Sequence, residues 1–164
     1  MASPEHPGIQ EQAQWLRGRY DQLIRAVEQT ADTAIITNRQ GVIEYVNPAF
    51  EETTGYSANE ALARTPRLLK SGLHDEQFYK KLWALLMAGK PFRGIIINRK
   101  KSGQLYWSAQ TISSMKDENG EITHFVSVLK DVTQLRKQQE QEFYLQIAHE
   151  VQQRLNSTVA LLPG

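Results

Sequence analysis

The strongest constraint on the fold is a central stretch in which short predicted strands alternate with turn sequences. Residues 34–37 and 42–46 flank an Asn-Arg-Gln-Gly turn, which predicts a β-hairpin because Gly41 tolerates a positive φ. Three further strands are predicted at residues 92–98, 104–115 and 121–130. The last two flank an Asp-Glu-Asn-Gly sequence, which favours a tight hairpin turn.

The segment between the second and third strands carries helix signals instead. A short helix is predicted to end at Gly55, and Ser57 with Glu60 forms a capping box for the next one. Asp75 is suited to cap a longer helix over residues 76–88. Five strands with short helices between the second and third predict an α+β domain built on an antiparallel sheet.

Residues 9–29 are predicted to form an amphipathic helix after a loose leader of residues 1–8. Its apolar residues recur in a heptad pattern, which is typical of a helix that pairs with a second copy of the chain. Packing of this helix on its own core is the alternative. The predicted seam is formed by Ile9, Leu16, Tyr20, Leu23 and Val27.

The composition changes again after residue 133. Residues 134–142 are rich in Gln, Lys and Glu, which favours a solvated helix. Apolar residues then return at helical spacing and predict a second seam, formed by Tyr144, Ala148, Val151 and Leu155. We therefore expect a homodimer that pairs through the helices on both sides of the central domain.

Composition excludes several kinds of function. The 164 residues include 19 Lys and Arg against 18 Asp and Glu, a net charge of +1. We therefore expect neither nucleic acid nor an anionic membrane as a partner. The chain has no cysteine, which excludes disulfides, thiolate metal sites, a cysteine nucleophile and a flavin–cysteinyl adduct. We expect no metal site, and the absence of a long apolar segment or signal-peptide pattern predicts a cytoplasmic location.

Residues 30–133 resemble a PAS domain with its C-terminal PAC motif. The resemblance rests on a series of short motifs in the expected order, namely Asn47-Pro48-Ala49-Phe50, Thr54-Gly55-Tyr56, Asn98 to Gly103, Asp117 to Gly120, and Asp131-Val132-Thr133. The resemblance implies a five-stranded sheet of order 2-1-5-4-3 with short helices on one face. It also implies a sensory and dimerisation role, with the signal leaving through the helix that follows Asp131 and Thr133.

The chain departs from the flavin-binding photosensory branch of this family. Of that branch's flavin-contacting positions, only Arg67 and Asn98 match, and the glutamine expected on the last strand is Leu129. We expect no cofactor, with Trp107 and Phe125 facing inward to fill the core. Flavin held by Arg67 and Asn98 is one alternative. Haem is another, with His74 as its axial ligand.

The C-terminal helix indicates the kind of effector that would follow. Residues 145–164 resemble the segment that precedes the catalytic domain of stress-regulator metal-dependent serine phosphatases. Residues 148–156 also resemble the phosphoacceptor box of sensor histidine kinases, in which His149 would accept the phosphoryl group with Glu150 as general base. We expect residues 134–164 to be a connector helix and the start of an effector domain, the phosphatase being favoured, and residues 1–164 to be non-catalytic.

Overall fold

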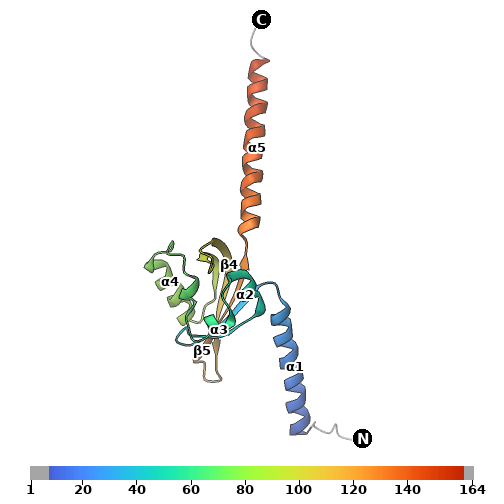
Figure 1. Ribbon diagram of the computed structural model, residues 1–164, viewed down its shortest axis with the longest axis vertical. Helices are drawn as coiled ribbons and strands as arrows, with labels where there is room; N and C mark the ends of the chain where they lie inside the picture. The colour runs from blue at the N-terminus through green and yellow to red at the C-terminus, as the bar shows by residue number, and fades with distance from the viewer. Residues whose placement is uncertain (1–7, 161–164) are drawn as a thin grey trace, which may run out of the picture.

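The computed structural model describes residues 8–160, without the side chains of Ile9, Leu16 and Tyr20. Figure 1 shows a central sheet domain with one long helix leaving it at each end. The elements follow in the order α1 (Ile9–Gln29), β1 (Thr33–Asn38), β2 (Ile43–Val46), α2 (Pro48–Thr54), α3 (Ala58–Ala61), the 3₁₀ helix η1 (Pro66–Leu69), α4 (Glu76–Met87), β3 (Phe92–Arg99), β4 (Leu105–Lys116), β5 (Ile122–Asp131) and α5 (Thr133–Val159).

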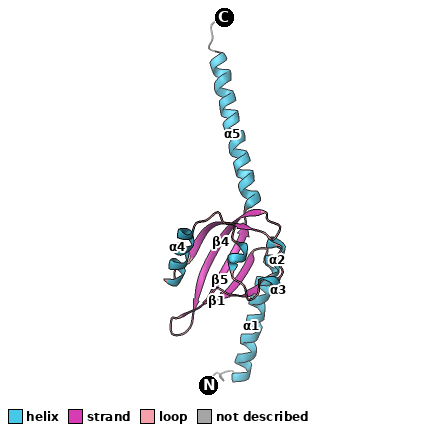
Figure 2. Cartoon of the chain, turned by 60° about the vertical axis from the view of Figure 1, so that its left-hand side comes forward, coloured by secondary structure: helices cyan, strands magenta, loops and turns pink. Residues whose placement is uncertain are grey.

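The five strands form one antiparallel sheet in the order β2-β1-β5-β4-β3. Figure 2 shows this sheet with the short helices on one side of it. The α+β class and the strand order predicted from the resemblance are confirmed. The first and last strands along the sequence, β1 and β5, lie side by side at the centre, so α1 and α5 are both attached to the middle of the sheet.

Local side-chain contacts explain where the short helices begin and end. Asn47 caps α2, and Gly55 ends it with a φ of 78°, a backbone conformation that other residues rarely adopt. Ser57 and Glu60 form the predicted capping box of α3. Asp75 caps α4, whose last helical residue is Met87, one residue earlier than predicted.

The apolar core lies between the sheet and the short helices, in two clusters. The first, beneath α2, α3 and η1, consists of Ile35, Ile43, Val46, Phe50, Ala61, Leu69 and Leu129. The second, beneath α4, consists of Leu82, Leu86, Ile96, Ile112, Ile122 and Phe125. Phe125 therefore faces inward as predicted.

The prediction that Trp107 faces inward is wrong. Tyr106 and Ser108 are buried on the covered face of β4, so the two-residue period of the strand directs Trp107 to the opposite face. There its ring lies against the guanidinium of Arg136, 4.1 Å from the ring centroid. Tyr106 and Trp107 are neighbouring large aromatic residues that point to opposite faces of the strand, and alternation alone does not decide which of the two is buried.

The long helices leave the core in different directions (Figures 1 and 2). α5 contains 27 residues and begins at Thr133, one residue before the predicted connector, and none of its residues is buried. Within residues 8–160, no helix is long and apolar enough to cross a membrane.

Candidate functional site

The covered face of the sheet carries a buried polar surface, which we call the inner polar face. It consists of Asn98 on β3 and Tyr106, Ser108 and Gln110 on β4, each at most 8% exposed. These residues adjoin both apolar clusters, because Gln110 pairs with Leu129 and Ser108 pairs with Ile96 across the sheet. The core is therefore divided by polar side chains at this place.

Two hydroxyl groups of the inner polar face have no hydrogen-bond partner among the described residues. They are the Tyr106 Oη and the Ser108 Oγ, both fully shielded from solvent. Burial raises the pKa of Tyr106 to about 12, so this phenol stays a neutral hydrogen-bond donor. An unpaired buried hydroxyl costs about 1–3 kcal/mol, so two of them are a reason to look for a polar ligand or water there.

The two predicted flavin contacts lie in different surroundings. Asn98 is buried on the inner polar face, whereas Arg67 is exposed on η1. Leu129 belongs to the first apolar cluster and supplies no polar group to the interior. Among the described residues, no three His, Asp or Glu side chains come together to form a metal site.

His74, the predicted haem ligand, makes a contact within the domain. Its Nε2 accepts a hydrogen bond of 2.9 Å from the backbone N–H of Ile97, and its ring stacks on Phe78 with 4.4 Å between centroids. The lone pair of Nε2 is therefore already used. An iron atom could bind this nitrogen only if the bond to β3 were broken.

The junction between the sheet and α5 is a compact hydrogen-bonded group. Thr133 Oγ1 accepts a hydrogen bond from the backbone N–H of Trp107 at 2.9 Å and donates one to Asp131 Oδ1 at 2.6 Å. The Val132 N–H donates to the Trp107 carbonyl at 2.8 Å. The predicted signal residues Asp131 and Thr133 thus connect the start of α5 to β4 and β5 at once.

Lys100 adds a charged group to this junction. Its Nζ lies 3.2 Å from Asp131 Oδ2 and 5.3 Å from the centre of the Tyr106 ring. Partial burial pushes the pKa of Asp131 up, but hydrogen bonds from Thr133 and the Lys100 ammonium outweigh it and hold this pKa below its usual value. Lys100 thereby links the inner polar face to the first residues of α5.

The predicted seams are exposed in the single chain. In α1, Leu23 and Val27 are exposed, while the side chains of Ile9, Leu16 and Tyr20 lie outside the described set. In α5, Ala148 is exposed with Tyr144, Val151 and Leu155, of which Tyr144 is 62% exposed. Both long helices therefore carry exposed apolar residues at helical spacing.

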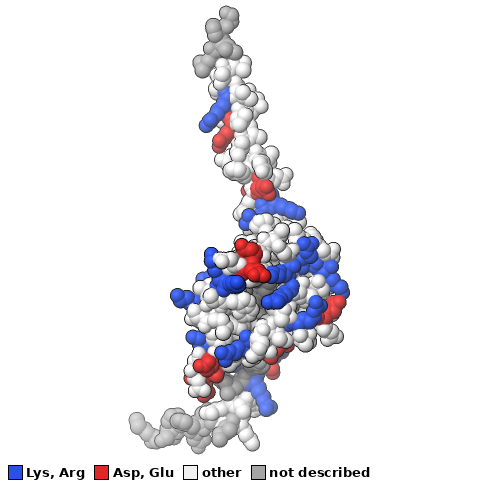
Figure 3. Space-filling model, turned by 90° about the vertical axis from the view of Figure 1, so that its left-hand side faces the viewer, with Lys and Arg blue, Asp and Glu red and all other residues white. Residues whose placement is uncertain are grey.

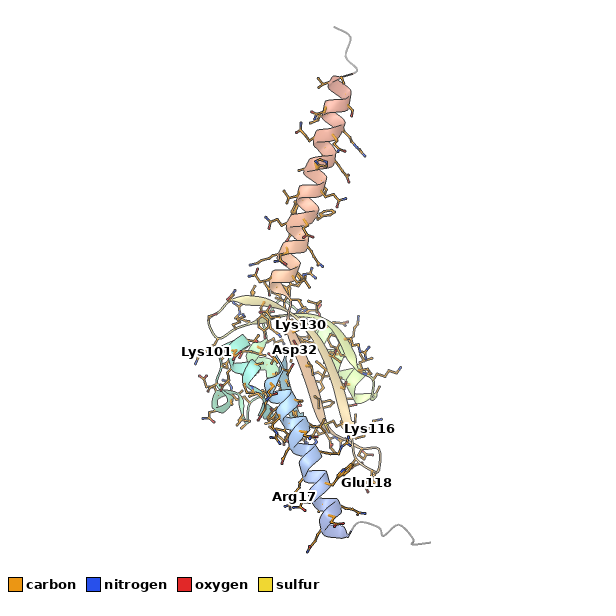
Figure 4. The ribbon with its side chains drawn as sticks, turned by 90° about the vertical axis from the view of Figure 1, so that its right-hand side faces the viewer. Arg17, Asp32, Lys101, Lys116, Glu118 and Lys130 are labelled. Atoms are coloured by element: carbon orange, nitrogen blue, oxygen red, sulfur yellow. The ribbon has the colours of Figure 1, made fainter. Side chains whose placement is uncertain are left out.

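The near-zero net charge conceals an uneven distribution. Residues 64–101 contain ten Lys or Arg and two Asp or Glu. Figure 3 shows the basic side chains gathered on the face to which α4 belongs. Figure 4 views a different side and places Lys130 near α5, with Lys116 and Glu118 at the other end of the sheet. Lys70 of this segment bridges to Asn98 on β3, and Arg99, the last residue of β3, donates to the Ser71 carbonyl, so both lie at the border of the inner polar face.

Several of these residues were missed from the sequence. The prediction of an inward Trp107 places Tyr106, Ser108 and Gln110 on the outer face of the strand, the reverse of what the structure shows. The available signal was three alternate polar positions, an arrangement that a purely structural core strand does not need. Asn47 and Lys100 were assigned to motifs, but their long-range contacts could not be read from spacing.

The fold and the sheet–helix junction together define a small α+β domain that carries one long helix at each end. The family model described as "PAS domain" matches residues 31–134, which is more than half of the chain. The chain belongs to the PAS domain family. It is thus a sensory domain of the kind found in signalling proteins.

Two relatives are a kinase and a regulatory protein. The chain is 39% identical over 111 residues to a blue-light-activated histidine kinase from Brucella abortus. The alignment covers 66% of the chain and 23% of that protein. It is 29% identical over 136 residues to a nitrogen fixation regulatory protein from Klebsiella oxytoca, which covers 83% of the chain and 25% of that protein. The chain therefore spans about a quarter of the length of these relatives.

Solved structures show the same fold. A structure of an RNA-binding light-oxygen-voltage receptor matches with a TM-score of 0.70 and 26% identity, covering 88% of this chain and 41% of that one. A PAS domain of a protein from Colwellia psychrerythraea matches with a TM-score of 0.67 and 21% identity, covering 71% of this chain and 98% of that one.

Proposed function

We propose that the chain is a sensory and dimerisation module that passes a signal from the interior of the sheet to an effector after α5. The observation that supports this proposal best is the junction of Asp131, Thr133 and Trp107. A change at the inner polar face would act on Tyr106, then on Lys100 and Asp131, and so on the first turn of α5. Such a signal shifts the balance between two arrangements of the paired helices.

The exposed stripes support dimerisation. Among the described residues, α5 contacts the sheet only near its start, and its apolar residues from Tyr144 onward are exposed there. Leaving them in water costs about 25 cal/mol for each Å² of apolar surface, which pairing with a second α5 would recover. The homodimer proposed here uses the seam of α5 together with that of α1.

Charge placed in the seam is expected to separate the two chains. We expect Val151→Glu combined with Leu155→Glu to convert a particle with the mass of two chains into one with the mass of a single chain. Gln153 lies on the opposite side of α5, so the Gln153→Glu variant is the matched control and is expected to stay dimeric. Light scattering coupled to size-exclusion chromatography measures the mass. Dimers that persist in the double variant would argue against the α5 seam.

A second candidate, binding of a polar small molecule, is supported by the unpaired hydroxyls of Tyr106 and Ser108. Asn98 and Gln110 add amide groups to the same surface, and Lys70 and Arg99 at its border would suit an anionic group there. The flavin alternative keeps Arg67 and Asn98 of the expected contact positions, whereas Leu129 would offer the flavin ring no hydrogen bond. Were flavin bound, it would supply redox chemistry. Haem through His74 is less well supported, because Nε2 is engaged by Ile97.

An absorption spectrum distinguishes the ligand-free module from the cofactor-bound one. We expect no band between about 350 and 700 nm in freshly purified protein, and Ser108→Ala to leave the free energy of unfolding unchanged or slightly higher, because this Oγ has no partner. A flavin or Soret band would overturn the ligand-free reading. A loss of stability in Ser108→Ala would indicate that the hydroxyl has a bound partner, and Ser108→Gly, which removes the whole side chain, gives the scale for that loss.

For the effector we propose a phosphatase, on the resemblance of residues 145–164, of which 161–164 lie outside the described residues. A histidine kinase is the alternative, supported by the Brucella relative. In that case His149 would be the phosphoacceptor with Glu150 as base. His149 is exposed on the side of α5 away from the seam, where its Nε2 lies 2.9 Å from the Gln153 Nε2. Pairing through the seam would therefore leave His149 accessible.

A further inference from the structure

The hydrogen bond between His74 and β3 bears on how the interior of the domain is closed. β3 is the last strand of the sheet, so its outer edge has no neighbouring strand. The Ile97 N–H on that edge donates to His74 Nε2 at 2.9 Å. The imidazole thus supplies the acceptor that a further strand would have supplied, and stacking on Phe78 holds the ring in place.

Two more contacts attach the segment of residues 70–74 to the same edge. Lys70 forms an isolated antiparallel bridge with Asn98. The guanidinium of Arg99 donates to the Ser71 carbonyl at 3.1 Å. Asn98 belongs to the inner polar face, so the 70–74 segment covers the border of that face. Of the three contacts, only the one from His74 requires a side chain in its neutral form, because Nε2 accepts the hydrogen bond.

We propose that neutral His74 positions the 70–74 segment over the border of the inner polar face, and that protonation of His74 releases the segment. A neutral imidazole has one nitrogen that accepts a hydrogen bond, whereas the imidazolium has two donors and no acceptor. A proton on Nε2 would direct an N–H group at the N–H of Ile97. The bond would be lost, and the ring would have to turn toward water.

The carboxylates of Asp75 and Glu76 follow His74 in the chain, and Tyr79 lies edge-on to its ring with 6.2 Å between centroids. Lys70 and Arg99 are the cations on the two segments that meet at this edge. Asp75 caps α4 by accepting from the Phe78 N–H at 2.8 Å, and Lys70 lies 4.2 Å from the centre of the Tyr79 ring. No ion pair to His74 is formed within the described residues, and Lys70 and Arg99 are cations. Acid therefore favours the released segment.

The consequence for sensing rests on the proposed function, because release would open the inner polar face to molecules from solution. The His74–Ile97 bond itself does not depend on that function. It is tested on the ligand-free chain, so the proposal about His74 and the proposal about signalling can fail separately.

Amide hydrogen exchange of the ¹⁵N-labelled full chain measures the bond directly. Each observed rate is divided by the intrinsic rate at the same pH, and Ile97 is compared with amides of the central strand β5. We expect the protection of Ile97 to fall about tenfold between about pH 7.5 and about pH 5.5, while the β5 amides keep theirs. Imidazole ¹⁵N shifts are expected to show Nδ1 protonated and Nε2 unprotonated at the higher pH.

Three variants separate the acceptor from other roles of the side chain. His74→Gln keeps an acceptor of similar reach without a titratable group, so Ile97 should stay protected at both pH values. His74→Phe keeps a ring to stack on Phe78 but has no acceptor, so the protection of Ile97 should be low at both. His124→Gln removes a half-buried histidine whose Nε2 lies 3.2 Å from the Glu44 carboxylate, and it should respond as the wild type does.

If the exchange protection of the Ile97 amide in the wild type did not change with pH, the proposal would be overturned. A proton on Nε2 at the higher pH, or a fall in protection that persists in His74→Gln, would overturn it too. If His74→Phe does not fold, the wild type and His74→Gln still decide the outcome, because both retain an acceptor at this position.

Discussion

Replacing Asn47 by alanine is expected to lower the free energy of unfolding by about 4 kcal/mol, a large part of the 5–15 kcal/mol that holds a domain folded. Asn47 is 1% exposed and makes four hydrogen bonds. Its Oδ1 accepts from the N–H groups of Ala34 and Phe50, at 2.8 and 3.2 Å. Its Nδ2 donates to the carbonyls of Val27 and Asp32, at 3.0 and 2.9 Å.

This one side chain therefore connects the end of α1, the start of β1 and the start of α2. Alanine would leave the Ala34 N–H and two carbonyl groups without their partners, at a cost of about 1–3 kcal/mol for each fully buried group. It would also remove the cap of α2, which is worth about 1 kcal/mol. The four costs share one site, so their sum is not additive and about 4 kcal/mol is the expected total.

Urea denaturation followed by circular dichroism measures the change, and Asn38→Ala is the matched control. Asn38 Oδ1 also accepts two backbone N–H groups, from Gln40 and Val42, both at 3.0 Å, but in a hairpin turn at the surface. Water can replace those bonds, so we expect a loss of about 1 kcal/mol in the control. Equal losses in the two variants would contradict the special position of Asn47.

Replacing Thr133 by valine is expected to lower the free energy of unfolding by about 2 kcal/mol and to detach the first turn of α5 from the sheet. Valine has nearly the shape of threonine but lacks the hydroxyl that accepts from Trp107 and donates to Asp131. The Trp107 N–H would lose its partner, and the carboxylate would lose a short hydrogen bond. Thr133→Ser keeps the hydroxyl and should retain most of the stability.

Exchange of the Trp107 and Val132 amides measures detachment independently of global stability. We expect faster exchange of both in Thr133→Val, with the β1–β2 hairpin unchanged. Faster exchange throughout the sheet would mean that the variant destabilises the whole domain instead. Equal exchange in Thr133→Val and the wild type would show that Thr133 is not the connection between β4 and α5.

The same junction gives the sign of a pH effect. The pKa of Asp131 is held below its usual value in the folded chain, so the folded state binds this proton more weakly than the unfolded state does. The contribution of Asp131 to stability is therefore present at neutral pH and is lost as the pH falls through the acidic range. Thr133→Val should reduce this acid dependence, because it removes one cause of the lowered pKa.

Local signals in the sequence predicted most of the elements of this fold. The capping box of Ser57 and Glu60, the cap at Asp75 and the helix end at Gly55 all lie where they were expected. Each depends on atoms a few residues apart, so spacing along the chain is enough to predict it. The strand order was a different case, because it came from the resemblance of ordered motifs to a known family.

The candidate site was predicted less well, because its contacts join residues far apart in the chain. His74 meets Ile97 across 23 positions, and Thr133 meets Trp107 across 26. The face of β4 that is buried followed from where α2 and α4 lie against the sheet. Residues alternate between the two faces of the strand whether Trp107 or the pair Tyr106 and Ser108 is buried. The strand sequence alone therefore could not show which face is covered.

The sequence by itself determined the α+β class, the turns, the caps and the two apolar helical stripes, since these depend on local conformation and periodicity. Only the tertiary structure decided that Asn98, Tyr106, Ser108 and Gln110 share a buried polar face, that His74 is bonded to the edge of the sheet, and that Lys100 and Asp131 join that face to α5. The physical reason is that a buried polar group is satisfied by whichever partner the packing brings to it, and packing is a property of the whole domain.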